Sequence, residues 1–398
     1  MNENIITTLK SEVNETLLDN ILPYWIEKMT DVQGGFYGRI DGNDNHIKGA
    51  DKGAILNARI LWTFSAAYRL FKKPEYLQMA TRAKRVIING FFDKEFGGIY
   101  WSLKDNGEPR DTKKQIYAIG FAIYGLSEYY RATSDTESLE YAISLFESIE
   151  KYSFDNDKNG YCEALTREWN EIDDMRLSEK DANERKTMNT HLHILEPYTN
   201  LYRVWKDERL EKQIRNLIDI FTDKILDKET SHLNLFFDDN WNSKYRIVSY
   251  GHDIEASWLI DEAVSVLEDK DLKNKILPII KNIADAASQG LTTKGSMIYE
   301  KNLEKGTIDR DSHWWVQSET VIGYLNMYQH TNEEEYLSKA IKCWEFIKDN
   351  LIDYDNGEWY WSISENGEVN RKDDKAGFWK CPYHNGRMCM EIIERFGA

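Results

Sequence analysis

The chain has 398 residues, and its 51 Lys and Arg against 68 Asp and Glu give a formal net charge of −17. Phosphate groups bind clustered Lys and Arg, and no such cluster is visible, which argues against a nucleic-acid partner and against an anionic membrane surface. No apolar run approaches the roughly 20 residues of a membrane-spanning helix. The unusual feature is the aromatic content, which is 13% of the chain and includes 13 Trp and 23 Tyr.

The N-terminal sequence and the cysteines indicate a compartment. The first residues, MNENIITTLKSEV, lack the basic start and the apolar core of a signal peptide. Disulfide frameworks belong to oxidising compartments and need dense, paired cysteines. Because the four cysteines (Cys162, Cys343, Cys381 and Cys389) form no CxxC pair, we expect a cytoplasmic protein, and we expect Cys381 and Cys389 to be small buried residues.

A β-hairpin pattern recurs along the chain. From Gly97 the sequence reads GGIYWSLKDNGEPRD, and from Gly357 it reads GEWYWSISENGEVNR. Alternating aromatic residues followed by Asn-Gly are a strong signal for a two-residue hairpin turn. Weaker versions occur elsewhere, so that six segments begin 62 to 73 residues apart, at Gly34, Gly97, Asn159, His232, Gly295 and Gly357. Such a period indicates a repeat architecture.

Two helical patterns lie between successive hairpins. The first is apolar nearly all round, as in QIYAIGFAIYGLSEYYRA from Gln115, which is typical of a buried helix. The second has one apolar stripe, as in Leu210, Ile214 and Leu217, which is typical of an outer layer. The sequence therefore predicts an all-α fold, an (α/α)6 barrel of six inner and six outer helices with short β-hairpins at one rim.

The ends of the chain fit the same plan. A helix over roughly Ile5 to Met29 is expected to complete the outer ring. No Pro/Gly/Ser-rich linker interrupts the repeat, so we expect one catalytic domain over residues 1–398.

Candidate functional residues lie where the inner helices begin. All six inner helices start at the same end of such a barrel, and the partial positive charge of their N-termini suits a developing oxyanion. Each repeat supplies at least one polar or aromatic candidate there: Arg59, Tyr117, Asn189, His193, His252, Glu255, Trp314, Trp315 and His384.

Spacing refines this set. His252 and Glu255 are three residues apart and share a helix face, so we expect the carboxylate to support and orient the imidazole. Asn189 and His193 are four apart and also share a face. His191 and His193 are two apart and point to nearly opposite faces, so only one of them can line the cavity.

The aromatic residues beside these polar groups suggest carbohydrate as the substrate class. Sugar rings present C–H faces that stack on aromatic side chains, and their hydroxyls need fixed donors and acceptors. Of the adjacent Trp314 and Trp315, at most one faces the lumen. Trp379 lies in a loop-like segment beside Cys381-Pro382, where exposure is expected.

Two other interpretations of the polar residues stay open at this point. The histidines and Glu255 are possible zinc ligands, but no HExxH motif or tight ligand cluster is present, and we expect no metal and no other cofactor. Each histidine is also a possible core residue. Arg59 lies in an apolar segment and needs a partner, which allows a purely structural ion pair.

Five segments carry a family resemblance: ADKGAILNARILW, KTMNTHLHILEPY, SYGHDIEASWL, HWWVQSE and WKCPYHNGRMCME. They resemble the signatures of the N-acylglucosamine 2-epimerase superfamily, and within it most closely those of the cellobiose 2-epimerases. The resemblance covers essentially the whole chain in order. It implies an (α/α)6 barrel and a cofactor-free isomerase that converts the reducing-end glucose unit of a β-1,4-linked disaccharide into its mannose epimer through ring opening and an enediolate.

The resemblance also implies roles for single residues. His252 and His384 match the general acid and base at carbon 2, and Arg59 matches the group that stabilises the enediolate. Other matched residues hold the sugar, assist its ring opening or pack on its rings, with Trp379 favouring the second sugar unit: Tyr117, Asn189, His193, Glu255, Trp315, Trp379 and, on a weaker match, Glu300.

The sequence leaves several activities open. A mannose-type aldose–ketose isomerase and an N-acylglucosamine 2-epimerase share the enediolate and differ in where the proton returns or in what the pocket admits. An inverting glycoside hydrolase needs two carboxylates roughly 6.5–9.5 Å apart, which a histidine-dominated rim disfavours. A non-catalytic sugar-binding module has no use for an arginine and three histidines at one rim. We expect a small oligosaccharide as the only partner and a monomer as the oligomeric state.

Overall fold

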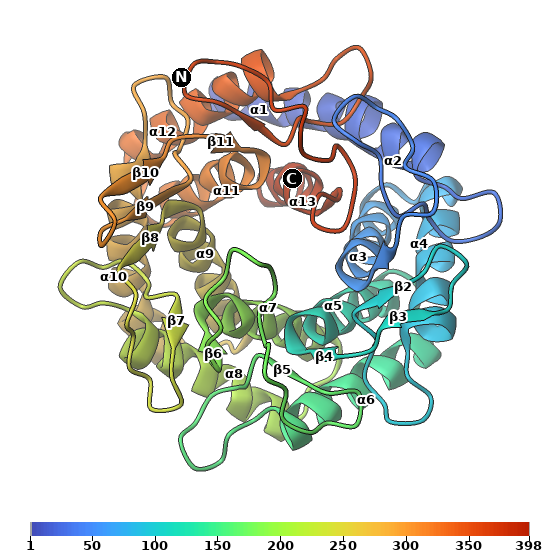
Figure 1. Ribbon diagram of the computed structural model, residues 1–398. Coiled ribbons are helices and arrows are strands. Elements are labelled where there is room, and N and C mark those ends of the chain that lie inside the picture. Colours follow the sequence, from blue (N-terminus) through green and yellow to red (C-terminus); the bar gives the residue numbers. More distant parts are fainter. Residues whose placement is uncertain (1, 398) are drawn as a thin grey trace.

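Two concentric rings of helices surround a central axis (Figure 1). The computed structural model describes residues 2–397, so the two end residues of the expected domain lie outside it. The inner ring consists of α3 (Ala54–Phe71), α5 (Ile116–Thr133), α7 (Met188–Val204), α9 (Tyr250–Val266), α11 (Trp314–Thr331) and α13 (Tyr383–Arg395). Each inner helix packs on the next, and α13 packs on α3, which closes the ring.

The outer ring alternates with the inner one along the chain. It contains α4 (Pro74–Val86), α6 (Thr136–Tyr152), α8 (Glu208–Ile220), α10 (Lys270–Ala287) and α12 (Glu334–Phe346). The helix expected over residues 5–29 completes it as α1 (Asn2–Glu15), the π-helical turn η1 (Thr16–Ile21) and α2 (Leu22–Lys28), and α1 packs on α13. The predicted (α/α)6 barrel is confirmed.

The two rings differ in burial as their sequences predict. In the inner helix α5, every residue from Ile116 to Tyr129 is buried. In the outer helix α8, burial follows the apolar stripe that includes Leu210, Ile214 and Leu217. An inner helix is covered on one side by its outer partner and on the other by the contents of the barrel, so its side chains are the ones available for a central site.

Short strands lie at the end of the barrel where the inner helices begin (Figure 1). Each strand that precedes an inner helix pairs antiparallel with a strand of the next repeat: β1 (Lys52–Gly53) with β2 (Ser102–Leu103), β4 (Lys114–Gln115) with β5 (Ala164–Leu165), β6 (Lys186–Thr187) with β7 (Phe236–Phe237), β8 (Ile247–Ser249) with β9 (Glu300–Asn302) and β11 (Ser312–His313) with β12 (Ser362–Ile363). An isolated bridge between Ile40 and Ala376 links the last repeat to the first.

The predicted hairpins are present at this rim, with one difference. The turn at Asn106-Gly107 joins β2 to β3 (Pro109–Asp111), as expected, and β9 forms a second hairpin with β10 (Thr307–Asp309). In the segments that begin at Asn159 and His232, β5 and β7 pair with strands of the preceding repeat. No Asn-Gly follows β5 or β7 in the sequence, and within the described residues neither strand forms a second hairpin like that of β2 with β3.

Buried ion pairs repeat at the same rim. The lysine just before an inner helix reaches an aspartate that follows an outer helix, as in Lys114 Nζ to Asp93 Oδ2 at 2.8 Å, where both side chains are fully buried. The same arrangement joins Lys52 to Asp31, Lys186 to Asp155 and Lys375 to Asp353. A buried charge is tolerated only when it is paired, so these pairs fix the loops that start the inner helices.

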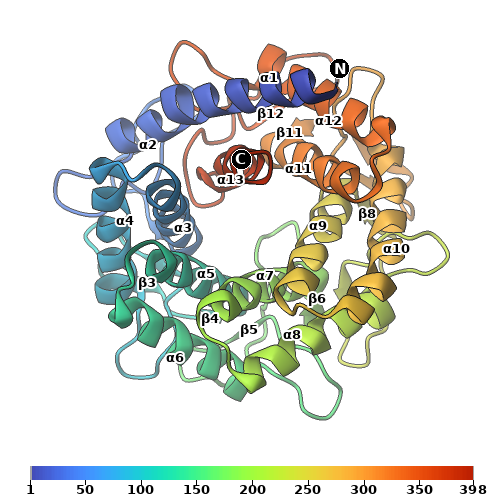
Figure 2. The same cartoon turned by 180° about the vertical axis from the view of Figure 1, so that it is seen from behind.

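The opposite end of the barrel carries the connections between the C-termini of the inner helices and the outer helices (Figure 2). We call this the far end, and the end with the strands the reaction end. Within residues 2–397, none of the helices combines the length and the apolar character of a membrane span.

Candidate active site

Equivalent positions on successive inner helices place side chains in layers around the axis. The first layer, from the second or third residue of each helix, holds Tyr117, Asn189, His252, Trp315 and His384. The second layer, from the fifth or sixth residue, holds Arg59, Phe121, His193, Glu255, Glu319 and Arg387. The layers are one helical turn apart, and helix N-termini from all six repeats surround them.

Arg59 is a buried arginine that stacks between aromatic rings. Its guanidinium lies 4.2 Å from the centre of the Phe121 ring and 4.8 Å from that of Tyr383. Its Nη2 donates to the Tyr117 hydroxyl at 2.8 Å, while Nε has no partner. No carboxylate of residues 2–397 forms an ion pair with it. The sequence requires a partner for Arg59, and this partner is the Tyr117 hydroxyl together with the faces of two aromatic rings. Because none of these groups carries a negative charge, the positive charge of Arg59 remains available to a ligand.

His384 is held by a carboxylate. Its Nδ1 lies 2.6 Å from Oε1 of Glu319, whose other oxygen accepts from Trp258 Nε1 at 2.9 Å. This contact fixes the imidazole and directs the proton to Nδ1, so that Nε2 is the free base. Burial, and then the charges of Arg59 and Arg387, lower the pKa of His384 well below its usual range.

His252 is held by a hydroxyl. Its Nδ1 lies 2.8 Å from the Ser249 hydroxyl oxygen, and burial lowers its pKa to about 3. The expected contact between His252 and Glu255 is wrong. Glu255 lies one turn deeper and accepts from Arg387 Nη2 at 2.9 Å, because a fully buried carboxylate is stabilised far more by a guanidinium than by a neutral imidazole.

His193 completes the set of imidazoles. Its Nδ1 lies 2.9 Å from Glu196 Oε2, its Nε2 lies 4.0 Å from Glu255 Oε2, and its ring meets Tyr117 edge-on at 4.9 Å. Burial lowers its pKa below the usual value. His193 therefore faces the axis, whereas His191 donates from Nδ1 to Thr187 O and accepts at Nε2 from Tyr161 N. The two imidazoles contact different groups on different sides of α7, as their spacing predicts.

Arg387 lies at the centre of three buried carboxylates. It bonds to Glu196, to Glu255 at 2.9 Å and to Glu319 at 2.6 Å. Burial, followed by repulsion from Glu319, raises the pKa of Glu255 well above its usual range. Against the effect of burial, Arg387 and His193 lower the pKa of Glu196 to about 2. Three acids thus share one cation and hold two imidazoles in place.

The ligand atoms of Glu255, Glu319 and His384 lie within 4.8 Å of one another, which is the spacing of a metal site. Arg387 donates to both carboxylates at this point. The positive charge that a metal would supply is therefore already present, and the donor set does not suit an added cation. The carboxylates instead orient His384 and Arg387.

One side of the first layer borders a cavity of about 330 Å³ at the reaction end. Asn189, His252 and Glu300 line it together, so three of the predicted residues from different repeats meet there. The Asn189 side-chain oxygen is buried without a hydrogen-bond partner among the described residues, which leaves it free to accept from a ligand. Burial, then Asp309, raises the pKa of Glu300.

The tryptophans divide as expected. Trp314 is buried and packs on Trp361, with ring centres 4.6 Å apart. Trp315 faces the imidazoles, with its ring centre 4.8 Å from that of His252 and 5.7 Å from that of His384. Trp379 is half-buried rather than open to solvent and lies 6.1 Å from Tyr117. Cys381 and Cys389 are buried, as predicted, and so are Cys162 and Cys343.

The sequence analysis missed Glu196, Glu319 and Arg387. All three stand in the segments KTMNTHLHILEPY, HWWVQSE and WKCPYHNGRMCME, in which the histidines, Asn189 and the tryptophans are the predicted site residues. The register of the repeat contains the signal: Glu319 occupies the same sixth position in α11 that Arg59, His193 and Glu255 occupy in their helices.

Known proteins share this sequence and fold. Residues 35–386 match the N-acylglucosamine 2-epimerase (GlcNAc 2-epimerase) family. The chain is 67% identical to the cellobiose 2-epimerase of Bacteroides fragilis over 97% of this chain and 98% of that protein. It is similar to the solved structure of cellobiose 2-epimerase from Bacillus thermoamylovorans, with 43% identity, a TM-score of 0.94, and coverage of 98% of this chain and 100% of that one. A D-mannose isomerase structure, with 19% identity, a TM-score of 0.82 and coverage of 98% and 97%, shares the fold.

Proposed function

The chain belongs to the N-acylglucosamine 2-epimerase family and is a carbohydrate epimerase, and from this premise we propose that it inverts carbon 2 of the reducing-end glucose unit of cellobiose. The observation that carries the proposal is the meeting of His252 and His384 on the ring of Trp315, beside a buried Arg59 that has no carboxylate. Two bases around one indole ring and one cation without a carboxylate partner suit proton transfer next to a carbonyl.

The reaction begins with ring opening, which exposes the aldehyde at carbon 1. An imidazole Nε2 then takes the proton from carbon 2. The C–H electron pair becomes the carbon–carbon double bond of an enediolate, and the carbonyl oxygen takes the negative charge. Burial leaves both imidazoles neutral at rest, so either can accept this proton. Glu319, at 2.6 Å, stabilises the imidazolium of His384 when it forms.

Inversion requires the proton to return to the opposite face of carbon 2. The second imidazole delivers it in a two-base route, and the first delivers it after rotation of the intermediate in a one-base route. Each proton transfer by a positioned group contributes about 10²–10⁴-fold to the rate. His193, backed by Glu196 and close to Glu255, is placed to move the proton between ring oxygen and carbon 1 hydroxyl during ring opening.

Arg59 stabilises the enediolate oxygens. Its charge is preorganised by Phe121, Tyr383 and Tyr117, so little reorganisation is needed when the negative charge appears. The N-termini of the inner helices add partial positive charge at the same end. We assign Trp315 to the reacting sugar, and Trp379 with Glu300 to the second unit. Hydrolysis is disfavoured because Glu255 and Glu319 both bind Arg387 rather than flank an open site.

One experiment tests this function. The protein is incubated with cellobiose in D₂O containing EDTA, and the sugar is followed by NMR. We expect glucosyl-mannose with deuterium at carbon 2. A ketose product would instead identify an isomerase, free glucose a hydrolase, and loss of activity in EDTA a metal enzyme. Each of these outcomes contradicts the proposal.

A further inference from the structure

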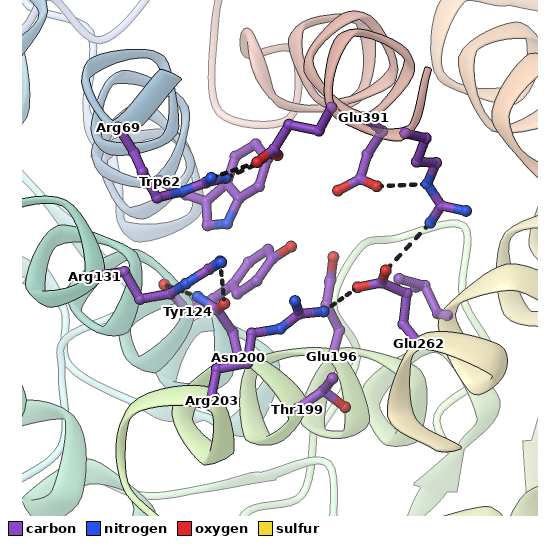
Figure 3. Close-up of a pocket in the computed structure, with 13 residues that line it drawn as sticks. Trp62, Arg69, Tyr124, Arg131, Glu196, Thr199, Asn200, Arg203, Glu262 and Glu391 are labelled. Atoms are coloured by element: carbon purple, nitrogen blue, oxygen red, sulfur yellow. Dashed lines mark hydrogen bonds and ion pairs between the residues drawn. The ribbon is translucent and has the colours of Figure 1, made fainter. Parts of the chain in front are cut away.

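A second chamber lies at the far end of the barrel, between the C-terminal halves of α3, α5, α7, α9 and α13 (Figure 3). Its volume is about 270 Å³. Arg59, His252 and His384 are not among the residues that line it, so it is distinct from the reaction centre. The wall between the two includes Glu196, which lines the chamber and also holds His193.

The charges around this chamber neutralise one another. Arg203 pairs with Glu262 at 2.5 Å, and Arg395 pairs with Glu391 at 2.8 Å and with Glu262 at 3.2 Å. Arg69 and Arg131 share Glu128, at 2.7 and 2.8 Å. These arginines also lie near helix C-termini, where positive charge is favourable. Because each cation already has a carboxylate, an entering ion would gain little net attraction, and the chamber suits a neutral polar ligand.

One buried donor in the chamber has no partner. Trp62 is 5% exposed, and its Nε1 donates to no group of residues 2–397. Figure 3 shows this nitrogen on the edge of the indole that faces the chamber, and the Tyr124 hydroxyl pointing into the same space. The two rings stack with centres 5.1 Å apart at 24°. A buried N–H without an acceptor is costly, so Trp62 marks the point where a ligand oxygen fits.

We propose that this chamber is a second binding site for a neutral polyol of monosaccharide size. A hydroxyl oxygen accepts from Trp62 Nε1, and the other hydroxyls bridge the arginine and glutamate side chains, since each hydroxyl both donates and accepts. A chamber of about 270 Å³ lies just below the range of about 300–1,000 Å³ that is usual for ligand pockets, which limits the ligand to one hexose-sized ring. The site does not rest on the proposed reaction.

The test uses the full chain labelled with 5-fluorotryptophan and observed by ¹⁹F NMR. The probe is 1,5-anhydro-D-glucitol, which has no carbonyl and cannot be epimerised. The Trp62 resonance is identified by its loss in Trp62→Phe. We expect this resonance to shift in a saturable way at millimolar probe. The resonances of Trp315 and Trp379 report the reaction centre in the same titration, and Trp205 in the outer part of the protein should not move.

A filled chamber provides the matched control. Leu259 lines the chamber from α9, and Leu259→Phe should abolish the Trp62 shift while Trp315 still responds. A Trp62 resonance that stays constant while Trp315 shifts would mean that the chamber holds only water, and would overturn the proposal. A response to sodium phosphate without a response to the polyol would mean an anion site, and would overturn it as well.

Discussion

The two ends of the barrel use the same residue types in opposite ways. At the far end, Arg69 and Arg131 each contact the buried carboxylate of Glu128. At the reaction end, Arg59 is more deeply buried and contacts only rings, a phenol and a thiol. Ion pairs at the far end link neighbouring inner helices. Removing one member of such a pair would leave the other as an uncompensated buried charge. A buried charge without a counter-charge makes sense only where the reaction itself brings one.

Carboxylates show the same contrast. Glu128 has two arginine partners which, against the effect of burial, lower its pKa. Glu163, equally buried, accepts from the hydroxyls of Thr187 and Thr190 and, at 3.5 Å, from the Gln115 amide, and burial raises its pKa to about 7. The arginines and carboxylates at the far end are therefore paired with opposite charges, whereas Arg59 and Glu163, at the end where we propose binding and reaction, are not.

The largest expected effect concerns the imidazoles. We expect His252→Ala and His384→Ala each to reduce kcat by up to about 10⁴-fold, because each removes one acid–base group. At the far side, His330 pairs with Asp261 at 2.7 Å in a similar imidazole–carboxylate contact. His330→Ala should alter the unfolding temperature and leave kcat nearly unchanged. Steady-state kinetics and thermal unfolding distinguish these patterns, and a His384→Ala enzyme that kept its activity would remove His384 from the mechanism.

The second comparison concerns the arginines. Arg59→Lys keeps the charge but loses the planar contact with Phe121 and Tyr383, and we expect kcat to fall about 10²–10³-fold through weaker enediolate stabilisation. Arg69→Lys should show the reverse pattern, a stability loss of about 1 kcal/mol with turnover within about twofold. Equal effects on kcat would contradict the assignment of Arg59 to the enediolate.

The carboxylates give opposite pH dependences of stability. Because the folded pKa of Glu163 lies above its unfolded value, this group's contribution to stability is full below the unfolded pKa and is lost as pH rises through about 7. Glu163→Gln should therefore gain stability relative to the wild type at pH 8, by at most about 3 kcal/mol.

Glu128→Gln is the matched control. The folded pKa of Glu128 is lowered, so its contribution is present above the unfolded pKa and is lost as pH falls. This variant should be destabilised at neutral pH, and the difference should shrink in acid. Chemical unfolding at pH 3, pH 5 and pH 8 measures both differences in stability, and parallel pH profiles for the two variants would contradict the contrast between the two carboxylates.

The smallest expected effect concerns the second sugar unit. Trp379→Ala should reduce kcat/KM for cellobiose about tenfold more than for glucose, which corresponds to the loss of a contact worth about 1.4 kcal/mol. Trp205→Ala, which removes an indole packed on Phe146, should change both substrates equally. An unchanged substrate ratio in Trp379→Ala would place that ring outside the disaccharide site.

The repeat and its period predicted the helix rings and the first layer of the site, because hydrophobic periodicity and turn residues act locally. The identity of the charged partners was not predictable in this way. Glu255 is 132 residues from Arg387, and Glu319 is 65 residues from His384, so their contacts depend on how the rings pack. Proximity in the sequence suggested a contact between His252 and Glu255. In the packed barrel Glu255 instead accepts a hydrogen bond from Arg387.

The closing bridge between Ile40 and Ala376 has a consequence for folding order. Arg59 comes from the first inner helix, and Cys381 and His384 from the last. Local helix pairs can form early, but contacts of such large sequence separation form late because the loop entropy must be overcome first. The helical repeats can therefore assemble as an open arc that has secondary structure and no activity, and enzymatic competence arises only when the two ends of that arc meet.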